Sequence, residues 1–480
     1  MKACTSLILK GGANRPLAGK SIMRRRRGRS AARQGTFKML RFITVAAVSI
    51  GLFLTQPAAF AQGAGEHWVG TWATAVVARA VRPPAGRGGG QGPQGQALQA
   101  APPAGQAPQA PPALPINFNN QTIREIVHVS LGGARIRVVL SNEFGDAPLA
   151  IGAAHVALRG PGAAIKAGSD RALTFAGKPG ISIPAGAVVF SDPAALTVPA
   201  LADLAISIYL PGDTSAGTSP LTMHGGANQT NYVSEPGDHT GDADLPMATT
   251  VPSWYFLSRV EVVAPERVKA IVALGDSITD GARTTPDTNS RWPDQLARRL
   301  DQAGMKVGVL NLGIAGNRVF LPEGVGPSAA SRFNRDVAAQ SGAAWVIFLE
   351  GINDLRNNPD MPAEDLIAAH KQIVDRAHAL GLKIIGGTLT AWEGNGPTFT
   401  PVTEAHRQAL NTWIRTSKAY DAVIDFDAVT RDPNHPTQLL EQFQSGDHLH
   451  PNDGGYQLMG NTIGLDLFKP AARTTTTSSR

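Results

Sequence analysis

Short apolar runs alternate with helical segments through the second half of the chain, and no other sequence feature restricts the fold as strongly. Each run has the length and apolar character of a buried strand. The strand candidates are residues 268–274, 307–312, 345–349, 383–386 and 422–426, and helical segments lie near 292–300, 363–380 and 403–417. Alternating strands and helices favour a parallel sheet covered by helices. Residues 265–471 are therefore predicted to form a three-layer α/β/α domain.

The preceding region, residues 62–260, has the pattern of an all-β domain. No strong amphipathic helix is visible there, and the segments that read as strands are 68–73, 123–129, 134–140, 188–190 and 204–210. Gly132-Gly133 predicts a hairpin turn between the second and third of these. The pattern favours a β-sandwich of the jelly-roll type.

A Pro-, Gly-, Gln- and Ala-rich stretch, residues 82–115, interrupts this β domain. Such a composition cannot bury enough apolar surface to offset its ordering entropy. The stretch is predicted to be a flexible insert, with an interdomain linker as the alternative. Residues 472–480 are predicted to be a disordered tail.

The first 61 residues are predicted to be an export leader. An apolar run at 42–54 precedes Ala59-Phe60-Ala61, whose small residues suit signal-peptidase cleavage, and the run is short for a membrane span. An uncleaved membrane anchor is the alternative, and Met39 is an alternative start. The expected location is secreted or periplasmic, with no stable membrane insertion after cleavage.

The net charge of +7 does not indicate a nucleic-acid partner. Twelve of the 44 Lys and Arg residues lie in the leader, which has no acidic residue, so the remainder carries 32 basic against 37 acidic side chains. A mildly acidic mature protein has no electrostatic basis for binding nucleic acid. The single cysteine, Cys4, is also in the leader, which excludes a cysteine nucleophile or a cysteine-ligated metal in the mature protein. No metal or cofactor is expected.

Four segments of the α/β region stand at predicted strand ends or in a late loop. They are GDSIT at 275–279, NLGIAGN at 311–317, GIND at 351–354 and DHLHP at 447–451. Loops at the carboxyl ends of parallel strands converge on one crevice. We therefore expect these segments to meet.

In this order, the four segments resemble the SGNH, or GDSL, hydrolase family. The resemblance places Ser277, Gly313, Asn353 and His450 at the four positions that name the family, with Asp447 three residues before the histidine. Residues 345–354 and 445–453 are also similar to a two-domain, secreted arylesterase and acylhydrolase subfamily associated with xylan degradation. The resemblance implies an SGNH-hydrolase fold with the nucleophile in a loop after the first strand.

The chemistry of these side chains fits a serine hydrolase. A serine hydroxyl is a poor nucleophile until a base takes its proton, and a histidine side chain can do so near neutral pH. His450 is the predicted base for Ser277, and Asp447 would hold the imidazole from its other nitrogen. The backbone N–H groups of Ser277 and Gly313 and the amide of Asn353 are the predicted oxyanion donors.

Other polar residues near these segments are expected to be structural or are possible pocket residues. Asp276 and Asp354 are expected to bond loop N–H groups, and His448 is expected to be a non-catalytic loop residue. Four residues could line the pocket: Asp280, Arg318, Trp392 and Glu393. The histidines of the β domain form no metal-ligand pattern and are expected to be structural or exposed; they are His67, His128, His155, His224 and His239.

The predicted function is hydrolysis of a carboxylic ester, with a short acyl group on a small ester or an acylated polysaccharide as the preferred substrate. The alternative is a carbohydrate-binding protein that acts through the β domain with little catalysis. In that case Trp68, Trp72, Trp254 and Tyr255 could stack on sugars, although core packing fits most of them better.

Overall fold

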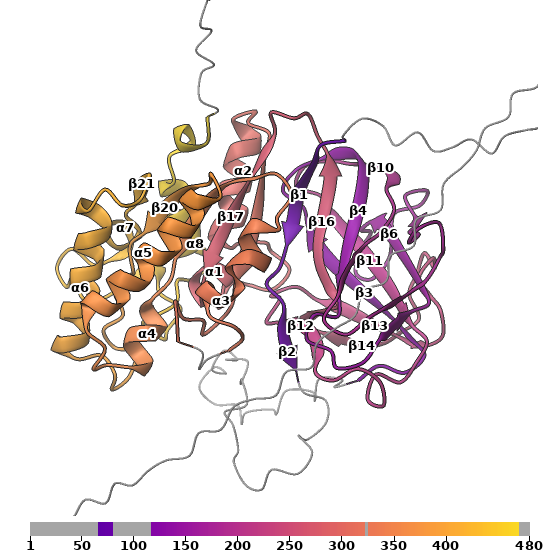
Figure 1. The fold of residues 1–480 in the computed structure, drawn as a ribbon, viewed down its shortest axis with the longest axis horizontal. Coiled ribbons are helices and arrows are strands. Elements are labelled where there is room, and N and C mark those ends of the chain that lie inside the picture. Colours follow the sequence, from indigo (N-terminus) through magenta and orange to yellow (C-terminus); the bar gives the residue numbers. More distant parts are fainter. Residues whose placement is uncertain (1–65, 80–116, 322–324, 470–480) are drawn as a thin grey trace, which may run out of the picture. The chain divides into compact units, whose positions relative to one another are not determined.

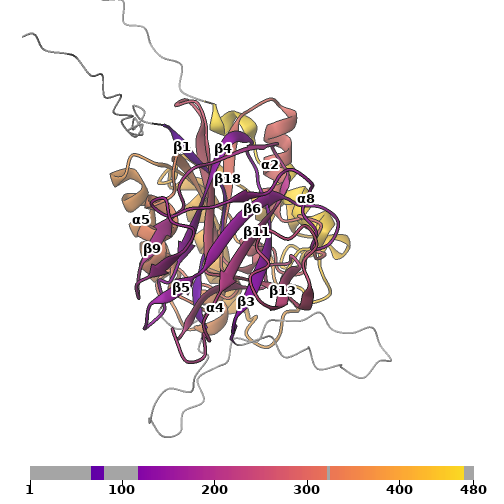
Figure 2. The ribbon, with the colours of Figure 1, turned by 90° about the vertical axis from the view of Figure 1, so that its right-hand side faces the viewer.

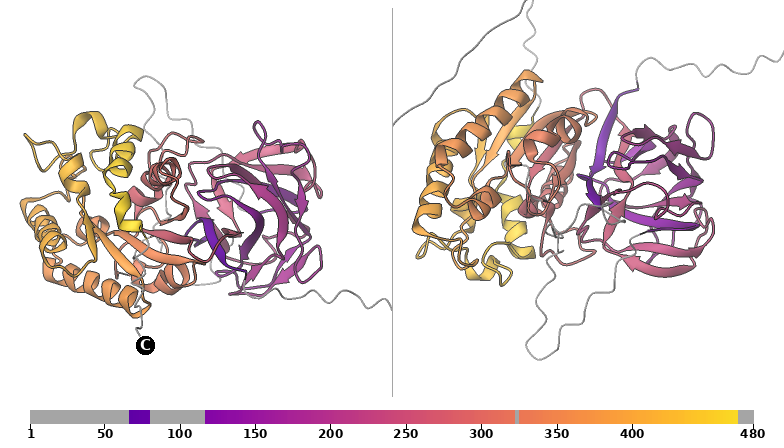
Figure 3. Two further views of the ribbon diagram at one scale, coloured as in Figure 1. Left: turned by 90° about the horizontal axis from the view of Figure 1, so that it is seen from above. Right: turned by 60° about the horizontal axis from the view of Figure 1, so that its bottom comes forward.

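The computed structural model describes residues 66–79, 117–321 and 325–469, which form an antiparallel β region followed by an α/β region (Figure 1). The predicted leader, the insert at 82–115 and the tail lie outside the described residues. The described residues all belong to one compact unit. Strands and loops make up the β region in the views of Figures 2 and 3, and the long helices belong to the α/β region.

A five-stranded parallel sheet forms the centre of the α/β region, in the order β18-β17-β19-β20-β21. Its strands are β17 (Lys269–Gly275), β18 (Val307–Gly313), β19 (Ala343–Leu349), β20 (Lys383–Gly387) and β21 (Ala422–Ile424). Each predicted run is a strand, but the prediction for the last one was too long. Phe426 begins the next helix instead, because the Asp425 side chain caps that helix by accepting the Ala428 N–H.

Helices cover both faces of this sheet. The strand order reverses after β18, and right-handed crossovers then place the helix before β18 on one face and the later crossover helices on the other. Consistently, α2 packs on α8, and α5 packs on α3 and α6. The helices are α1 (Ser277–Asp280), α2 (Trp292–Gln302), α3 (Ala329–Phe333), α4 (Ile352–Asn357), α5 (Ala363–Ala379), α6 (Pro401–Thr416), α7 (Phe426–Thr430) and α8 (Asp453–Thr462).

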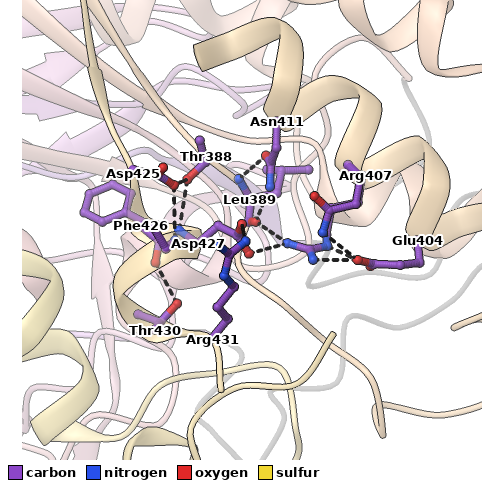
Figure 4. Close-up of polar contacts among 12 residues, drawn as sticks. Thr388, Leu389, Glu404, Arg407, Asn411, Asp425, Phe426, Asp427, Thr430 and Arg431 are labelled. Carbon is purple, nitrogen blue, oxygen red and sulfur yellow. Dashed lines mark hydrogen bonds and ion pairs between the residues drawn. The ribbon is translucent and has the colours of Figure 1, made fainter. Parts of the chain in front are cut away.

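A buried ion pair fixes the loops that follow β20 and β21 (Figure 4). The guanidinium of Arg407, in α6, donates to Asp427 of α7 at 2.6 Å and to the carbonyl of Leu389 at 2.8 Å. Glu404 holds the other side of the same guanidinium at 2.7 Å. Arg407 and Asp427 are both fully buried, and such a charge pair is tolerated because its hydrogen bonds are satisfied. The carboxyl edge of the sheet is thus rigidly tied to α6.

The β region contains two larger antiparallel sheets, consistent with a β-sandwich. Ile123 and Ile206 of one sheet and Val138 and Val260 of the other lie in one hydrophobic core. One sheet has the order β1-β16-β4-β10, with β9 also paired to β4; these strands are β1 (Trp68–Ala73), β4 (Gly133–Ser141), β9 (Val188–Phe190), β10 (Ala194–Val198) and β16 (Leu257–Val263). The other has the order β14-β13-β3-β11-β6-β7; these are β3 (Gln121–His128), β6 (Ala153–Leu158), β7 (Arg171–Ala172), β11 (Asp203–Leu210), β13 (Asn231–Pro236) and β14 (Met247–Val251). The jelly-roll connectivity stays a prediction.

Two smaller antiparallel sheets complete the β region. One joins β15 (Ser253–Tyr255), β12 (Leu221–Gly225) and β2 (Val77–Arg79), and the other joins β5 (Leu149–Ile151) and β8 (Ile181–Ile183). The three-stranded sheet matters for the site below because β12 carries His224.

The predicted hairpin at Gly132-Gly133 is wrong. β3 and β4 lie in different sheets, so the chain crosses between sheets at this point. The glycine is needed for a close backbone approach: a Cβ at Gly132 would lie 2.5 Å from the carbonyl oxygen of Val198. A glycine pair signals such an approach as readily as it signals a turn.

Hydrogen bonds join the β region to the edge of the parallel sheet. The Ser130 hydroxyl accepts the Val309 N–H of β18 at 2.9 Å, and the Gly70 N–H of β1 donates to the Ser341 carbonyl at 2.9 Å. A Cβ at Gly308 of β18 would lie 2.2 Å from the Gly70 carbonyl oxygen. The backbones of β1 and β18 are therefore in close contact.

Candidate active site

Ser277 lies where β17, an inner strand of the parallel sheet, ends and α1 begins. Asp276 is the N-cap of this helix, and its carboxylate accepts the Ile278 N–H at 2.9 Å. Ser277 is therefore the first residue of a one-turn helix rather than part of an irregular loop. Its side chain is buried, with 5% of the residue exposed. The site lies beside the position where the strand order reverses, a common place for ligand sites in doubly wound sheets.

Three side chains form a continuous chain of hydrogen bonds at this point. The Oγ of Ser277 lies 2.8 Å from Nε2 of His450, and Nδ1 of His450 lies 2.7 Å from Oδ2 of Asp447. Asp447 and His450 project from one turn, in which Oδ1 of Asp447 accepts the N–H of His450 at 2.9 Å. The structure thus brings together the predicted nucleophile, base and orienting carboxylate.

The carboxylate of Asp447 is held in its charged form. Burial alone would raise the pKa of Asp447, but the hydrogen bond from the His450 ring and the backbone N–H groups of Leu449 and His450 lower this pKa well below its ordinary value. Nδ1–H of His450 therefore donates to an ionised carboxylate, and the lone pair of Nε2 faces the Ser277 hydroxyl. In this arrangement the imidazole can accept the hydroxyl proton.

The predicted oxyanion donors differ in whether their N–H groups already donate to an acceptor in the protein. As the first residue of α1, Ser277 has an N–H with no acceptor inside the helix. The Asn353 amide donates one hydrogen to the Asn317 carbonyl at 3.1 Å and retains a second. The N–H of Gly313, in contrast, donates to Oδ1 of Asn311 at 3.0 Å. Ser277 and Asn353 are better placed to donate than Gly313.

The orientation of the Asn353 amide is set by Arg356. A guanidinium only donates, and Arg356 donates to Oδ1 of Asn353 at 3.1 Å. The amide nitrogen must therefore point away from Arg356, toward Asn317. This contact was not predicted from the sequence.

Gly316 is a further donor candidate that the sequence reasoning missed. Its φ of +79° favours glycine, and within the described ranges its N–H has no hydrogen-bond partner. It precedes Asn317, whose carbonyl accepts the Asn353 amide. The second glycine of the NLGIAGN segment was the available signal. Gly313 also serves packing, since a Cβ there would lie 2.2 Å from the backbone nitrogen of Asp280.

Two acidic residues beside the site have the structural role that the sequence predicted. Asp276 caps α1, and Asp354 accepts the Val319 N–H at 3.0 Å. Burial raises the pKa of Asp276 to about 7 and that of Asp354 to about 6. Burial also raises the pKa of Glu350, with Asp276 adding to the effect. These carboxyl groups resist ionisation because they are buried near one another.

Most of the four residues that could line the pocket make structural contacts instead. Trp392 is fully buried in a cluster with Ile352 and Leu449, and Glu393 accepts the hydroxyl of Thr437. Asp280 is buried and pairs with His224. Arg318 is partly buried, and nothing in its contacts assigns it to a substrate. His448 is exposed.

The histidines of the β region make structural contacts. His128, His155 and His239 lie within hydrogen-bonding distance of Asp203, Asp170 and Asp242, and His67 contacts the Val268 carbonyl. Across the described part of the chain, His, Cys, Asp and Glu side chains do not gather in groups of three or more that could hold a metal ion. Within the same ranges, no helix combines the length and apolar character needed to cross a membrane.

The aromatic residues of the carbohydrate-binding alternative are mostly buried. Trp72, Trp254 and Tyr255 are exposed by 8%, 6% and 0%. Trp72 and Trp254 pack edge to face at 5.0 Å, and Trp68 lies under the guanidinium of Arg137. The three buried rings cannot stack on a sugar without a change in the core.

Comparison with known proteins finds similarity in the α/β region. Residues 273–458 match the model of the GDSL-like Lipase/Acylhydrolase family. Similar solved structures include a lipase/acylhydrolase from Enterococcus faecalis, at 22% identity over 42% of this chain and 95% of that chain, with a TM-score of 0.34. A GDSL-like lipase from Bacteroides thetaiotaomicron is 20% identical over 41% of this chain and 85% of that chain, with a TM-score of 0.32. An acetylxylan esterase from Geobacillus stearothermophilus is 21% identical over 40% of this chain and 91% of that chain, with a TM-score of 0.32. A comparison with curated protein sequences gives no match.

Proposed function

We propose that the chain is a serine esterase that works through an acyl-enzyme. Residues 273–458 match the model of the GDSL-like Lipase/Acylhydrolase family, which supports a hydrolase that acts on esters. Ser277 is the nucleophile, His450 the general base and Asp447 the residue that orients it. The observation that carries this proposal is the hydrogen-bond chain from Ser277 Oγ to His450 at 2.8 Å and on to Asp447 at 2.7 Å.

The reaction follows from this geometry. Ser277 Oγ attacks the ester carbonyl carbon while its proton passes to Nε2 of His450. The ester C–O bond then breaks, and the imidazolium gives that proton to the leaving alkoxide, which departs as an alcohol. Water attacks the acyl-enzyme in the same way, with His450 again taking a proton. The carboxylic acid leaves, and the Ser277 hydroxyl is restored.

The negative charge of the tetrahedral intermediate needs hydrogen-bond donors. The N–H of Ser277 and the free hydrogen of the Asn353 amide are proposed for this role, with Gly316 or Gly313 as the third donor. Each such donor contributes roughly 10²- to 10³-fold to turnover in comparable sites. Gly313 can contribute only if its N–H leaves or shares its bond to Asn311.

The proposed substrates are esters of short acyl groups, including acetyl groups on polysaccharides. This preference rests on the resemblance of residues 345–354 and 445–453 to secreted acylhydrolases. Export to the periplasm or the medium is part of the proposal and rests on the apolar run at 42–54 and on Ala59-Phe60-Ala61.

Replacement of the nucleophile tests the proposal directly. Ser277→Ala is expected to lower kcat for p-nitrophenyl acetate by at least about 10³-fold, since among the described residues only the Ser277 hydroxyl lies within hydrogen-bonding distance of the His450 imidazole. The control is Ser417→Ala, an exposed serine at the end of α6, which should retain wild-type turnover. Equal rates for Ser277→Ala and wild type would overturn the proposal.

A fluorophosphonate should label wild type at Ser277. A series of acyl esters of increasing length, together with acetylated xylan, would then define the substrate.

A further inference from the structure

His224 is a buried residue of the β region that contacts the nucleophile helix. Its side chain is 3% exposed, and it lies in β12, 53 residues before Ser277. Nδ1 lies 2.8 Å from the carbonyl oxygen of Ala75, and Nε2 lies 3.0 Å from Oδ1 of Asp280. Asp280 is the last residue of α1, the helix that begins with Ser277.

The partners of His224 define its protonation. A carbonyl oxygen only accepts, so Nδ1 must carry a hydrogen, and an ionised carboxylate also only accepts, so Nε2 must carry one too. A ring with two N–H groups is an imidazolium. Burial opposes this charge, but the carboxylate of Asp280 outweighs burial and raises the pKa of His224. The charged groups that face the ring are Asp280 and, more distantly, Arg291 at the start of α2.

Asp280 transmits this contact to the oxyanion side of the site. Its second oxygen, Oδ2, accepts the Ala315 N–H at 3.1 Å, in the loop between Gly313 and Gly316. Its backbone carbonyl accepts from Nε of Arg291 at 2.9 Å. One carboxylate therefore joins the β region, the nucleophile helix and the loop that carries the candidate donors.

We propose that His224 is a positioning residue for the reaction: its ion pair with Asp280 holds the 313–317 loop against α1 and so sets the oxyanion donors relative to Ser277. This inference rests on the proposed esterase function. It assigns the β region a part in turnover without a contact to substrate.

The pair has a defined pH dependence. Because its folded-state pKa is raised, His224 contributes stability that is fully present below its unfolded-state pKa and is lost as the pH rises through the folded-state pKa. Loss of the proton removes the donor to Asp280 and frees the loop. Turnover should therefore fall on the alkaline side.

The test compares kcat and KM for p-nitrophenyl acetate across pH 6–9, corrected for spontaneous hydrolysis. His224→Gln is expected to lower kcat roughly 10- to 100-fold at pH 7 with little change in KM, because misplaced donors act on the transition state. The matched control is His155→Gln, a β-region histidine paired to Asp170 at 2.9 Å, which should behave as wild type.

Asp280→Asn separates positioning from folding. An Asn can accept the Ala315 N–H and donate to a neutral His224, so this variant should fold and lose the alkaline decline of kcat. The double variant should be no worse than His224→Gln, since both changes act on the same contact. Wild-type kcat in a folded His224→Gln variant would overturn the inference, as would an unchanged alkaline decline in Asp280→Asn. Absence of turnover and of Ser277 labelling in wild type would instead overturn the proposed function.

Discussion

Asp447 shows how much of the proposed chemistry depends on one carboxylate. Oδ1 accepts the N–H groups of Leu449 and His450, and Oδ2 receives Nδ1 of His450 and Nε of Arg283, the latter at 3.2 Å. These donors stabilise the ionised form and fix the imidazole through a single turn of chain. The orientation of His450 is therefore set within four residues.

Replacement of Asp447 by Asn should prevent His450 from acting as a base while keeping a side chain of similar size and shape. The Asn amide can donate to Nδ1, which would place the imidazole hydrogen on Nε2, where it cannot accept the Ser277 proton. We expect kcat for p-nitrophenyl acetate to fall roughly 10³- to 10⁴-fold at pH 7. Asp453→Asn is the control, since among the described residues the Asp453 carboxylate accepts a hydrogen bond only from the Thr285 N–H. Equal losses in the two variants would contradict the assigned role.

The sequence predicted the residues of local motifs better than those defined by distant contacts. Ser277, Asp447 and His450 lie in short motifs whose order indicates their roles. His224 has no such signal, because a single histidine in a strand gives no information about a partner 56 residues away. The same holds for Arg356 and Asn353: their spacing is helical, but the direction of the amide follows from hydrogen-bond chemistry seen only in the structure.

At the scale of elements, the end of β18 is packed directly on α1. A Cβ at Gly313 would lie 2.2 Å from the nitrogen and 2.6 Å from the Cα of Asp280, both in the helix backbone. Backbone cannot rotate away as a side chain can. A glycine at 313 is therefore required for the position of the helix that begins with Ser277.

Gly313→Ala should shift α1 and reduce both stability and activity. We expect overpacking to cost about 1–3 kcal/mol of the free energy of unfolding, measured by urea denaturation, together with a lower kcat. Gly212→Ala is the matched control, because a Cβ there has no heavy atom within 4 Å and its φ is not positive. A Gly313→Ala variant as stable and active as wild type would show that α1 can move freely.

Elements were predictable where burial gives a clear pattern. The strands of the parallel sheet are covered on both faces, so they read as unbroken apolar runs, and all five were found. Pairing between strands was less predictable. β3 and β4 are adjacent in sequence, but β3 pairs with β11 and β13, and nothing near Gly132 indicates partners so far along the chain.

At the scale of the whole molecule, the described β and α/β regions share a core. Val69 of β1 and Leu310 of β18 belong to one hydrophobic cluster, and a Cβ at Gly70 would lie 2.8 Å from a methyl carbon of Leu310. β18 is an edge strand of the parallel sheet, and the β region covers it. An uncovered edge strand tends to pair with other chains.

The α/β region alone should therefore not form a stable, monomeric protein. Residues 265–471 expressed without the β region are expected to aggregate, because β18 would lose the Ser130 acceptor of its Val309 N–H and expose Leu310. Size-exclusion chromatography with light scattering and near-UV circular dichroism would measure this. A monomeric fragment that unfolds cooperatively with the kcat of the full chain would refute the expectation.

The contact between His224 and Asp280 also limits how such a chain can be recombined. A chimera that takes its β region from one relative and its α/β region from another would keep the pair only if both parents carry it. Crossover points between residues 224 and 280 would otherwise leave a lone buried charge, in either order of exchange. In a library of shuffled genes, inactive members should therefore cluster by the parentage of these two positions, even where every residue around Ser277 is intact.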